Sequence, residues 1–257
     1  MLSYQHLYHA GNPADVHKHA LLAWMLARLG EKPKPLSYIE THAGRGIYDL
    51  SAPEAVKTGE AAAGIGRLLP RFAPDHPYRT AIEALRQAEG AEAYPGSPAL
   101  AAHLLREGDT MHLAELHPQE HAALEGAVGW RARVHRQDGF ELALSLAPPD
   151  PRRGLLLIDP SFEVKADYET IPKVMRQLHK AWNVGVLALW YPILRDAAHL
   201  EMLTSLELSG FTKTERHEVR FPPVREGHRM IGSGLFVINA PYGLAEEAAR
   251  IEAMFKG

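Results

Sequence analysis

Short apolar segments alternate with longer amphipathic segments along most of this chain. The segments Leu36–Ile39, Leu155–Ile158 and Val184–Trp190 are mostly apolar, which is typical of strands that are buried on both faces of a sheet. Between such segments, apolar residues recur at intervals of three and four, which indicates helices with one buried face. Because strands and helices alternate, the pattern predicts an α/β fold with a mainly parallel sheet.

The regular part of the pattern predicts seven strands. The first covers residues 36–40, and the other six follow residue 109. These six lie in the segments TMHLAELHP, ARVHRQDGF, GLLLIDPSF, VGVLALWYP, FTKTERHEVRF and GSGLFVINAP. The last two enclose a basic loop and close the sheet, and a helix over GLAEEAARIEAMFKG follows them.

The segment before the first strand, PADVHKHALLAWMLARLG, predicts a strongly amphipathic helix with Asp15 in its first turn. Leu22 and Leu26 repeat at helical spacing on one face. His19 shares that face and Lys18 lies beside it, so packing against the first strand brings both near the turn that follows the strand. On this segment alone, His19 is interpreted as a histidine of the core.

Residues 47–94 interrupt the alternation. They are rich in alanine and punctuated by proline, with helical stretches around Gly59–Leu69 and Tyr78–Ala88 and without a convincing strand. We therefore expect a small helical insertion after the first strand, within a single domain that spans residues 1–257. After the insertion, YPGSPALAAHLLREGD predicts a turn and a helix from Pro98.

Composition limits the possible functions. The 46% hydrophobic and 23% charged residues are ordinary for a soluble globular protein, and no apolar run reaches the roughly 18–20 residues of a membrane helix. We expect no export signal, and the lack of cysteine excludes thiol chemistry and suits a reducing cytoplasm. The net charge of -3 confines any nucleic-acid contact to a local patch. Arg220, Arg225 and Arg229 are the candidates, and a solvated hairpin tip is the alternative.

The 15 histidines raise the question of a metal site. HPQEH separates His117 and His121 by four residues, a spacing that can place two ligands on one helix face. Pro118, however, is favoured at the first position of a helix, which leaves His117 before it. No third ligand has a recognisable spacing, so we expect no metal.

Four predicted strands end in acidic residues, namely Glu40, Glu115, Asp138 and Asp159. In an open α/β sheet, ligands bind outside the carboxyl ends of the strands. The first strand also runs into a turn of small residues, Ala43–Gly46. The acids therefore predict the rim of a nucleoside cleft, with Glu115 placed to accept from ribose hydroxyls and Asp138 from an adenine amino group.

The segments around these acids resemble a known family. Their order is similar to that of class I S-adenosylmethionine-dependent methyltransferases, and DPSF resembles the [DNS]-P-P-[YFW] motif of enzymes that methylate adenine N6. More narrowly, MLSYQHLYHAGNPADVHKH, ETHAGRGIYDL, YPGSPALAAHLLRE, AELHP, DGF, RRGLLLIDPSFE, ALWYPI and GSGLFVINAP resemble the 23S ribosomal RNA adenine-N6-methyltransferases of the RlmJ type. The resemblance runs from Met1 to about Tyr242 and implies a Rossmann-like class I methyltransferase fold with S-adenosylmethionine as methyl donor.

Carried over residue by residue, the resemblance implies two groups of site residues. Those that bind S-adenosylmethionine are His19, His42, Ser97, Glu115, Asp138 and Gly139. On the side of the target adenine, the resemblance implies Asp159 in catalysis and Tyr4 in handling the base. The residues themselves add Pro160 and Phe162 to catalysis, from the chemistry of the turn, and Lys18, Phe162, Arg225 and Arg229 to RNA binding, from their position and charge. Ser161 stands where the motif has a second proline, so the turn is expected to be less rigid than in the motif.

The chemistry of the turn fits this assignment. The amino nitrogen of adenine is a poor nucleophile because its lone pair is delocalised into the ring. The Asp159 carboxylate and the Pro160 carbonyl can accept its two N–H bonds and hold the nitrogen in line with the sulfonium methyl group. Phe162 then stacks on a base that is unstacked or comes from a single-stranded loop.

Other interpretations stay open at this point. LLLIDPSF alone is also explained as a buried strand that ends at a proline turn. The same motif serves a DNA adenine-N6-methyltransferase, and a non-catalytic role in the use of external DNA or a methyltransferase of small molecules are further alternatives. With the ribosomal RNA interpretation, we expect a cytoplasmic monomer that acts on naked 23S RNA or an early assembly intermediate, without a membrane.

Overall fold

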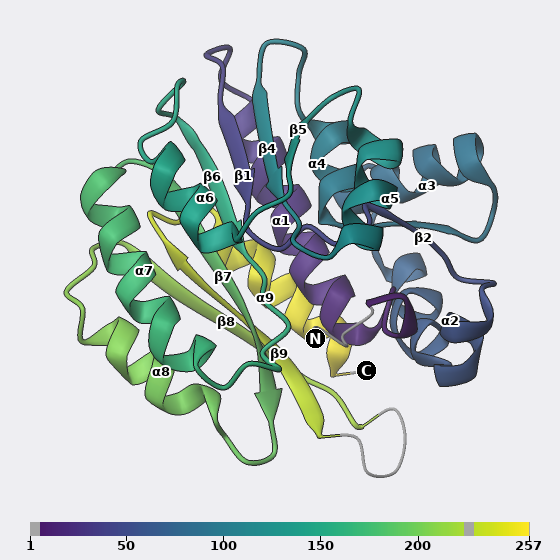
Figure 1. Cartoon of the computed structure of the whole chain (residues 1–257). Coiled ribbons are helices and arrows are strands. Elements are labelled where there is room, and N and C mark those ends of the chain that lie inside the picture. Colours follow the sequence, from purple (N-terminus) through teal and green to yellow (C-terminus); the bar gives the residue numbers. More distant parts are fainter. Residues whose placement is uncertain (1–5, 224–228, 257) are drawn as a thin grey trace.

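The computed structural model describes residues 6–223 and 229–256. Its centre is a seven-stranded sheet with the order β5-β4-β1-β6-β7-β9-β8 (Figure 1). β1 pairs in parallel with β4 and β6, whereas β9 is antiparallel to both of its neighbours. The predicted seven-stranded, mainly parallel α/β sheet is confirmed. Its strands are β1 Ser37–Glu40, β4 Thr110–Ala114, β5 Arg133–His135, β6 Gly154–Ile158, β7 Val186–Leu194, β8 Thr214–Arg220 and β9 Met230–Ile238.

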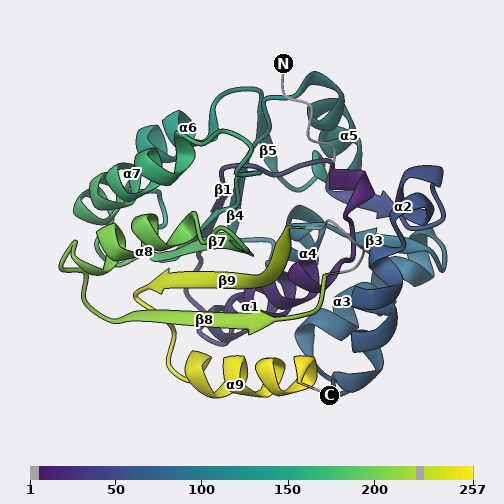
Figure 2. The same cartoon turned by 90° about the horizontal axis from the view of Figure 1, so that it is seen from below.

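Helices cover both faces of this sheet (Figure 2). One face carries α6 Gly139–Leu146, α7 Asp167–Ala181 and α8 His199–Glu207, and the other carries α1 Pro13–Gly30, α4 Ser97–Leu104, α5 Pro118–Val128 and α9 Leu244–Phe255. Each face has its own apolar core, one around Trp182 and the other around Leu21. β1 and β6 are buried at every position, which explains the continuous apolar run of β6.

The segment between β1 and β4 contains two strands that the sequence pattern does not predict. They form an antiparallel pair separate from the main sheet. The expectation of no strand was wrong because three residues are too few to show an alternating pattern. The elements of this segment are β2 Ile47–Asp49, α2 Pro53–Thr58, a π-helical stretch Ala62–Gly66, a 3-10 turn Leu69–Arg71, α3 Pro77–Glu89 and β3 Ala93–Pro95.

Strand β7 is longer than its sequence predicts. It continues past Trp190 to Leu194. β6 ends opposite Leu189, so beyond that point β7 pairs with β9 alone. A proline is tolerated where a strand has a free side, which explains how Pro192 lies inside the strand. Trp190, Pro192 and Leu194 alternate along this projecting end and line the cleft described below.

The start of α1 is fixed by contacts with the segment between β1 and β4. Asn12 caps the helix, because its Oδ1 accepts a hydrogen bond from the backbone N–H of Asp15 at 2.8 Å. Gly64, in the π-helical stretch, packs so closely that a Cβ there would lie 2.1 Å from the carbonyl oxygen of Gly11. Only glycine allows this approach, so the segment between β1 and β4 holds the chain that leads into α1.

Candidate active site

A cleft of about 550 Å³ lies at the carboxyl ends of β1, β4 and β6. Its walls combine the 3-10 turn His6–Tyr8 and α1 with the turn after β1, the start of α4 and the projecting end of β7. Of the four strand-end acids predicted for this rim, Glu115 and Asp159 line the cleft, whereas Glu40 and Asp138 are not among its described lining residues. Of the predicted site residues, the cleft is lined by Lys18, His19, His42, Ser97, Glu115, Asp159, Pro160, Phe162 and Arg229.

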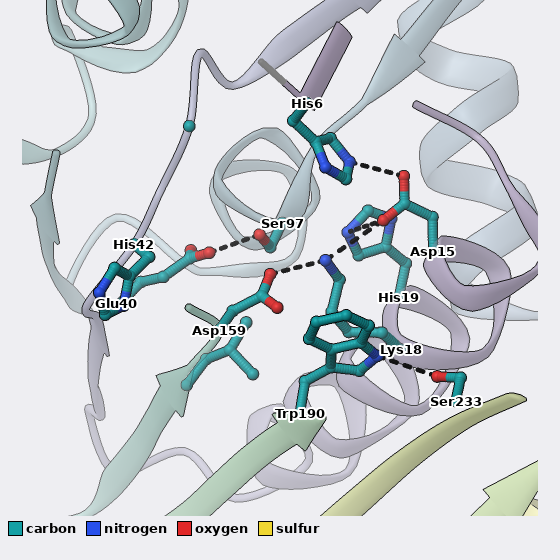
Figure 3. Close-up of polar contacts among 12 residues, drawn as sticks. His6, Asp15, Lys18, His19, Glu40, His42, Ser97, Asp159, Trp190 and Ser233 are labelled. Atoms are coloured by element: carbon teal, nitrogen blue, oxygen red, sulfur yellow. Dashed lines mark hydrogen bonds and ion pairs between the residues drawn. The ribbon is translucent and has the colours of Figure 1, made fainter. Parts of the chain in front are cut away.

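Lys18 and Asp159 form an ion pair inside the cleft (Figure 3). Lys18 Nζ donates to Asp159 Oδ2 at 2.6 Å and lies 3.2 Å from Asp15 Oδ1 on its other side. The ammonium group is also 5.4 Å from the centroid of the Trp190 ring, a cation–π contact. Burial lowers the pKa of Lys18, but the two carboxylates outweigh burial and raise the pKa above its ordinary value. The side chain is therefore a cation.

Asp15 connects Lys18 to the N-terminal segment. It is 2% exposed, and its Oδ2 accepts hydrogen bonds from His6 Nε2 at 2.9 Å and from the Gly11 N–H at 3.0 Å. His19 Nε2 lies 4.0 Å from Oδ1. Burial raises the pKa of Asp15, but His6, Lys18 and His19 together lower it well below its ordinary value. Asp15 is thus an anion in spite of its burial.

His19 is both a core residue and a residue of the cleft. It is 1% exposed, and its Nδ1 lies 2.9 Å from the Tyr94 hydroxyl, which is in turn 3.0 Å from the hydroxyl of Tyr78. Both tyrosines come from the segment that follows β1. Burial lowers the pKa of His19 well below its ordinary value, and Asp15 offsets this only in part. The imidazole is therefore neutral and is held in place by the segment between β1 and β4.

Glu40, at the end of β1, is a second fully buried carboxyl group beside the cleft (Figure 3). Ser97 Oγ donates to its Oε1 at 2.5 Å, and the Tyr38 hydroxyl donates to its Oε2 at 2.7 Å. Burial raises the pKa of Glu40 to about 8, although the two hydrogen bonds lower it. Glu40 therefore fixes the side chain of Ser97, the first residue of α4, at the wall of the cleft.

The turn after β1 and the acid after β4 are in direct contact. Glu115 Oε2 accepts a hydrogen bond from the Gly44 N–H at 2.9 Å, and its Oε1 accepts from the His117 N–H at 2.7 Å. Gly44 has a φ of +64°, and a Cβ there would lie 2.6 Å from the Tyr48 hydroxyl oxygen. Glycine is required at this position, and the turn holds Glu115 at the rim.

Asp138 and Gly139 are placed differently from the other predicted residues, because neither is among the described residues that line the cleft. Asp138 caps α6, since its Oδ1 accepts from the N–H groups of Phe140 and Glu141 at 2.9 and 3.0 Å. Gly139 lies so close to the end of β1 that a Cβ would be 1.8 Å from the Thr41 carbonyl oxygen. Contact of either residue with a methyl donor stays a prediction.

The turn after β6 has an unusual backbone at Phe162. Its φ is +55°, in the left-handed region that costs a bulky residue on the order of 1 kcal/mol. The ring is 8% exposed and packs with its centroid 4.9 Å from that of Tyr168 and 6.1 Å from that of Trp190. Phe162 therefore reaches the cleft from within an aromatic cluster, and its stacking on a target base stays a prediction.

The predicted RNA contacts are described only in part. Tyr4 and Arg225 lie outside the described residues. Arg229 lines the cleft and forms an ion pair with Asp196. Lys18 is 4% exposed, so any contact it makes with RNA is restricted to a nucleotide that enters the cleft.

His6, Asp15 and Trp190 are among the residues of the cleft that the sequence analysis did not predict as site residues. The sequence held one signal for the contact between Asp15 and Lys18, because residues three positions apart on a helix lie on the same face. No such spacing marks Trp190, whose position depends on the neighbouring strand β9. Its indole N–H donates to Ser233 Oγ of that strand at 2.9 Å. The same Oγ lies 2.9 Å from His17 Nδ1.

His117 precedes α5, as the proline after it predicts. In residues 6–223 and 229–256, no group of three or more His, Cys, Asp or Glu side chains could hold a metal ion. Over the same described ranges, none of the helices combines the length and the apolar character needed to cross a membrane.

The sequence matches a family model described as "Ribosomal RNA large subunit methyltransferase D, RlmJ" over residues 33–256. Two relatives carry the name ribosomal RNA large subunit methyltransferase J. The Escherichia coli protein is 39% identical over 254 residues, which are 96% of this chain and 90% of that protein. The Haemophilus influenzae protein is 37% identical over 257 residues, which are 98% of this chain and 92% of that protein.

Solved structures agree with the fold. The protein LPL1258 from Legionella pneumophila has a TM-score of 0.86 at 35% identity, over 95% of this chain and 92% of that one. The O-methyltransferase TomG from Streptomyces achromogenes, solved in complex with S-adenosylmethionine, has a TM-score of 0.50 at 12% identity, over 87% and 80% of the two chains. The second likeness concerns the fold alone, and it confirms the predicted class I methyltransferase fold.

Proposed function

The chain belongs to the RlmJ family of ribosomal RNA large subunit methyltransferases, and from that premise we propose that it methylates the N6 amino group of one adenine in 23S ribosomal RNA, with S-adenosylmethionine as methyl donor. One observation carries the proposal. The Asp159–Pro160 turn follows the central strand β6 and opens into a nucleoside-sized cleft. The Asp159 side chain is 11% exposed there, so it is shielded from water but accessible to a ligand.

The described residues on one side of the cleft fit the methyl donor. Glu115 stands at the rim with its carboxylate fixed by Gly44 and His117, where it can accept from ribose hydroxyls. Ser97, held by the buried Glu40, provides a polar wall for the amino acid part of the donor. When bound, S-adenosylmethionine supplies an electrophilic methyl group on a sulfonium sulfur. The cleft volume of about 550 Å³ is within the range of small-molecule and cofactor sites.

The part of the cleft around Asp159 is proposed to bind the target adenine, whose amino nitrogen is the nucleophile. Lys18 occupies Oδ2 of Asp159, and among the described residues no donor is bound to Oδ1, which leaves that oxygen to accept one amino N–H of adenine. The Pro160 carbonyl is proposed to accept the other. Two acceptors localise the lone pair on nitrogen and aim it at the methyl group, so positioning and fixed charge carry the catalysis. The donor would supply the methyl group and keep the electrons of its C–S bond on sulfur, and the Asp159 carboxylate would be a base for the proton that the amino nitrogen loses.

The aromatic residues of the cleft support a base that has left its stack. Phe162 and Trp190 lie on the Asp159 side, with Trp190 beneath the Lys18 ammonium group. Stacking on such rings compensates for the loss of stacking in the RNA. The target adenine therefore lies in a single-stranded or looped part of the RNA.

The setting follows from the substrate. We propose that the enzyme acts in the cytoplasm as a monomer, on naked 23S RNA or an early assembly intermediate. The entry is a cleft rather than a flat surface, which favours RNA whose target loop is not yet packed into the ribosome.

The proposal is tested by the choice of acceptor. The protein is incubated with labelled S-adenosylmethionine and with unmodified 23S RNA, ribosomal particles or DNA. Label is expected as N6-methyladenine in 23S RNA. Label in DNA alone supports a DNA methyltransferase instead, and the absence of both transfer and methyl-donor binding contradicts any catalytic role.

A further inference from the structure

Asp15 is a buried acid whose position is unlike that of the strand-end acids. It lies in the first turn of α1, and it contacts residues of three kinds: His6 of the N-terminal segment, His19 on the methyl-donor side and Lys18 on the Asp159 side (Figure 3). A carboxylate that is 2% exposed is costly to bury unless its charge is used or compensated. Here the compensating charge is Lys18, and Lys18 is shared with Asp159.

We propose that Asp15 is a positioning residue of the methyl transfer, which holds the Lys18 ammonium group between two carboxylates so that the charge of Asp159 is only partly paired and one of its oxygens is left for the adenine amino group. This inference rests on the proposed function. Lys18 Nζ is 3.2 Å from Asp15 Oδ1 and 2.6 Å from Asp159 Oδ2. Asp15 acts through Lys18, because no hydrogen bond or ion pair joins the two carboxylates themselves.

The charge balance explains why the second carboxylate matters. With Asp15 ionised, one cation serves two anions and the three groups together carry a charge of -1. With Asp15 neutral, Lys18 would pair with Asp159 alone, and the pair would carry no net charge. A carboxylate whose charge is fully paired is a weaker acceptor for the amino protons. Asp15 therefore keeps Asp159 reactive at the atom that faces the substrate.

A nearby acid provides a matched control. Glu60 is fully buried, holds the same N-terminal region and accepts from His9 and from Asn12 Nδ2 at 3.0 and 3.2 Å. Its hydrogen bonds to described residues, those with His9 and Asn12, involve neither Lys18 nor Asp159. Loss of charge at Glu60 tests the effect of loosening the N-terminal region, whereas loss of charge at Asp15 tests the lysine as well.

The experiment is a double-mutant cycle on the single-turnover rate of RNA methylation at saturating S-adenosylmethionine. The variants are Asp15→Asn, Lys18→Met, the double variant, and Glu60→Gln alone and with Lys18→Met. Asp15→Asn is expected to slow transfer about tenfold or more, the range of coupling between contacting charged residues, with the dissociation constant of the methyl donor within about threefold of wild type. The double variant is expected to be no slower than Lys18→Met, whereas Glu60→Gln and Lys18→Met multiply.

Three results overturn the inference: a wild-type rate in Asp15→Asn, rates of Asp15→Asn and Lys18→Met that multiply, or a loss in Asp15→Asn that lies entirely in methyl-donor binding. Thermal melts identify variants that fail to fold. If Asp15→Asn is one of them, Asp15→Glu decides, because it keeps the charge and is expected to keep most of the rate; a folded Asp15→Glu as slow as Lys18→Met contradicts the inference. A wild-type protein that methylates no RNA counts against the proposed function, which separates the two outcomes.

Discussion

Lys18 and Asp159 are 141 positions apart in the sequence, and their side chains meet at 2.6 Å in the cleft. The contact joins the first helix to the turn after the central strand. The ammonium group binds Oδ2 of the Asp159 carboxylate, and among the described residues no donor binds Oδ1, which is left for a ligand of the cleft. The predictions below follow from this arrangement and from the buried groups around it.

We expect the buried Glu40 carboxyl group to make the free energy of unfolding depend on pH. Its pKa is raised by burial from 4.5 to about 8, so between these values the folded state binds a proton that the unfolded state does not. Its contribution to stability is complete below pH 4.5 and is lost as the pH rises toward 8, with a slope of at most about 1.4 kcal/mol per pH unit. Urea unfolding at pH 5.5 and 7.5 measures this slope. Glu40→Gln is expected to lose the slope, and an unchanged slope in that variant assigns it to another group.

We expect Glu115 to contribute to the affinity for the methyl donor. Its carboxylate accepts from two backbone N–H groups and has lone pairs left for ribose hydroxyls. Glu115→Gln keeps the size but replaces one acceptor by a donor. The dissociation constant of S-adenosylmethionine is expected to rise about tenfold or more, because hydrogen bonds to charged groups contribute roughly 1.5–3 kcal/mol. Calorimetry measures it, with Glu125→Gln on the exposed face of α5 as control. Equal effects of the two substitutions would rule out this role.

We expect Trp190 to contribute to the affinity for RNA. Its ring lies under the Lys18 ammonium group and beside Phe162. Trp190→Ala removes the aromatic surface, and the KM for RNA is expected to rise about tenfold or more, since base stacking is worth roughly 1–3 kcal/mol. Methyl-donor binding is expected to stay near wild type, and Trp190→Phe should retain most of the affinity for RNA. A loss of methyl-donor binding with an unchanged KM for RNA argues against a base at this wall.

We expect the close packing of Gly139 between β1 and α6 to be necessary for the stability of the fold. A Cβ there would lie 1.8 Å from the Thr41 carbonyl oxygen, so Gly139→Ala should lower the free energy of unfolding by at least about 1–3 kcal/mol. Gly126 is a matched control, because it lies in α5 with nothing within 4 Å of an added Cβ. Gly126→Ala should raise stability by about 0.5–1 kcal/mol. Two substitutions of the same sign would contradict the packing described here.

The sequence was sufficient to predict the sheet and much of the cleft. Glu115 and Asp159 are next to strands whose direction is readable from the alternation of strands and helices, and parallel strands bring their carboxyl ends together. Asp138 shows the limit of that rule. It also ends a strand, but its Oδ1 is bound by the N–H groups of α6, and capping and ligand binding by an acid are not distinguishable from the sequence.

The rest depended on contacts between distant segments. The Asp15–Lys18–Asp159 arrangement could not be predicted, because helical spacing relates the first two residues but nothing in the sequence relates Lys18 to Asp159. Trp190 lies in a strand that was expected to end there, and it reaches the cleft because β6 ends opposite Leu189. The left-handed backbone of Phe162 has no signal in the sequence either, since glycine or asparagine is the usual residue in that conformation.

The central claim is that Asp159 carries the transfer to adenine N6 in ribosomal RNA. The direct measurement is the amount of N6-methyladenine formed in unmodified 23S RNA by wild type and by Asp159→Asn, with methyl-donor binding measured on both proteins. The account predicts that Asp159→Asn binds S-adenosylmethionine within about threefold of wild type and forms N6-methyladenine at least about 100-fold more slowly, the usual size of such a group's contribution. A variant that folds, binds the methyl donor and methylates 23S RNA at the wild-type rate would contradict it.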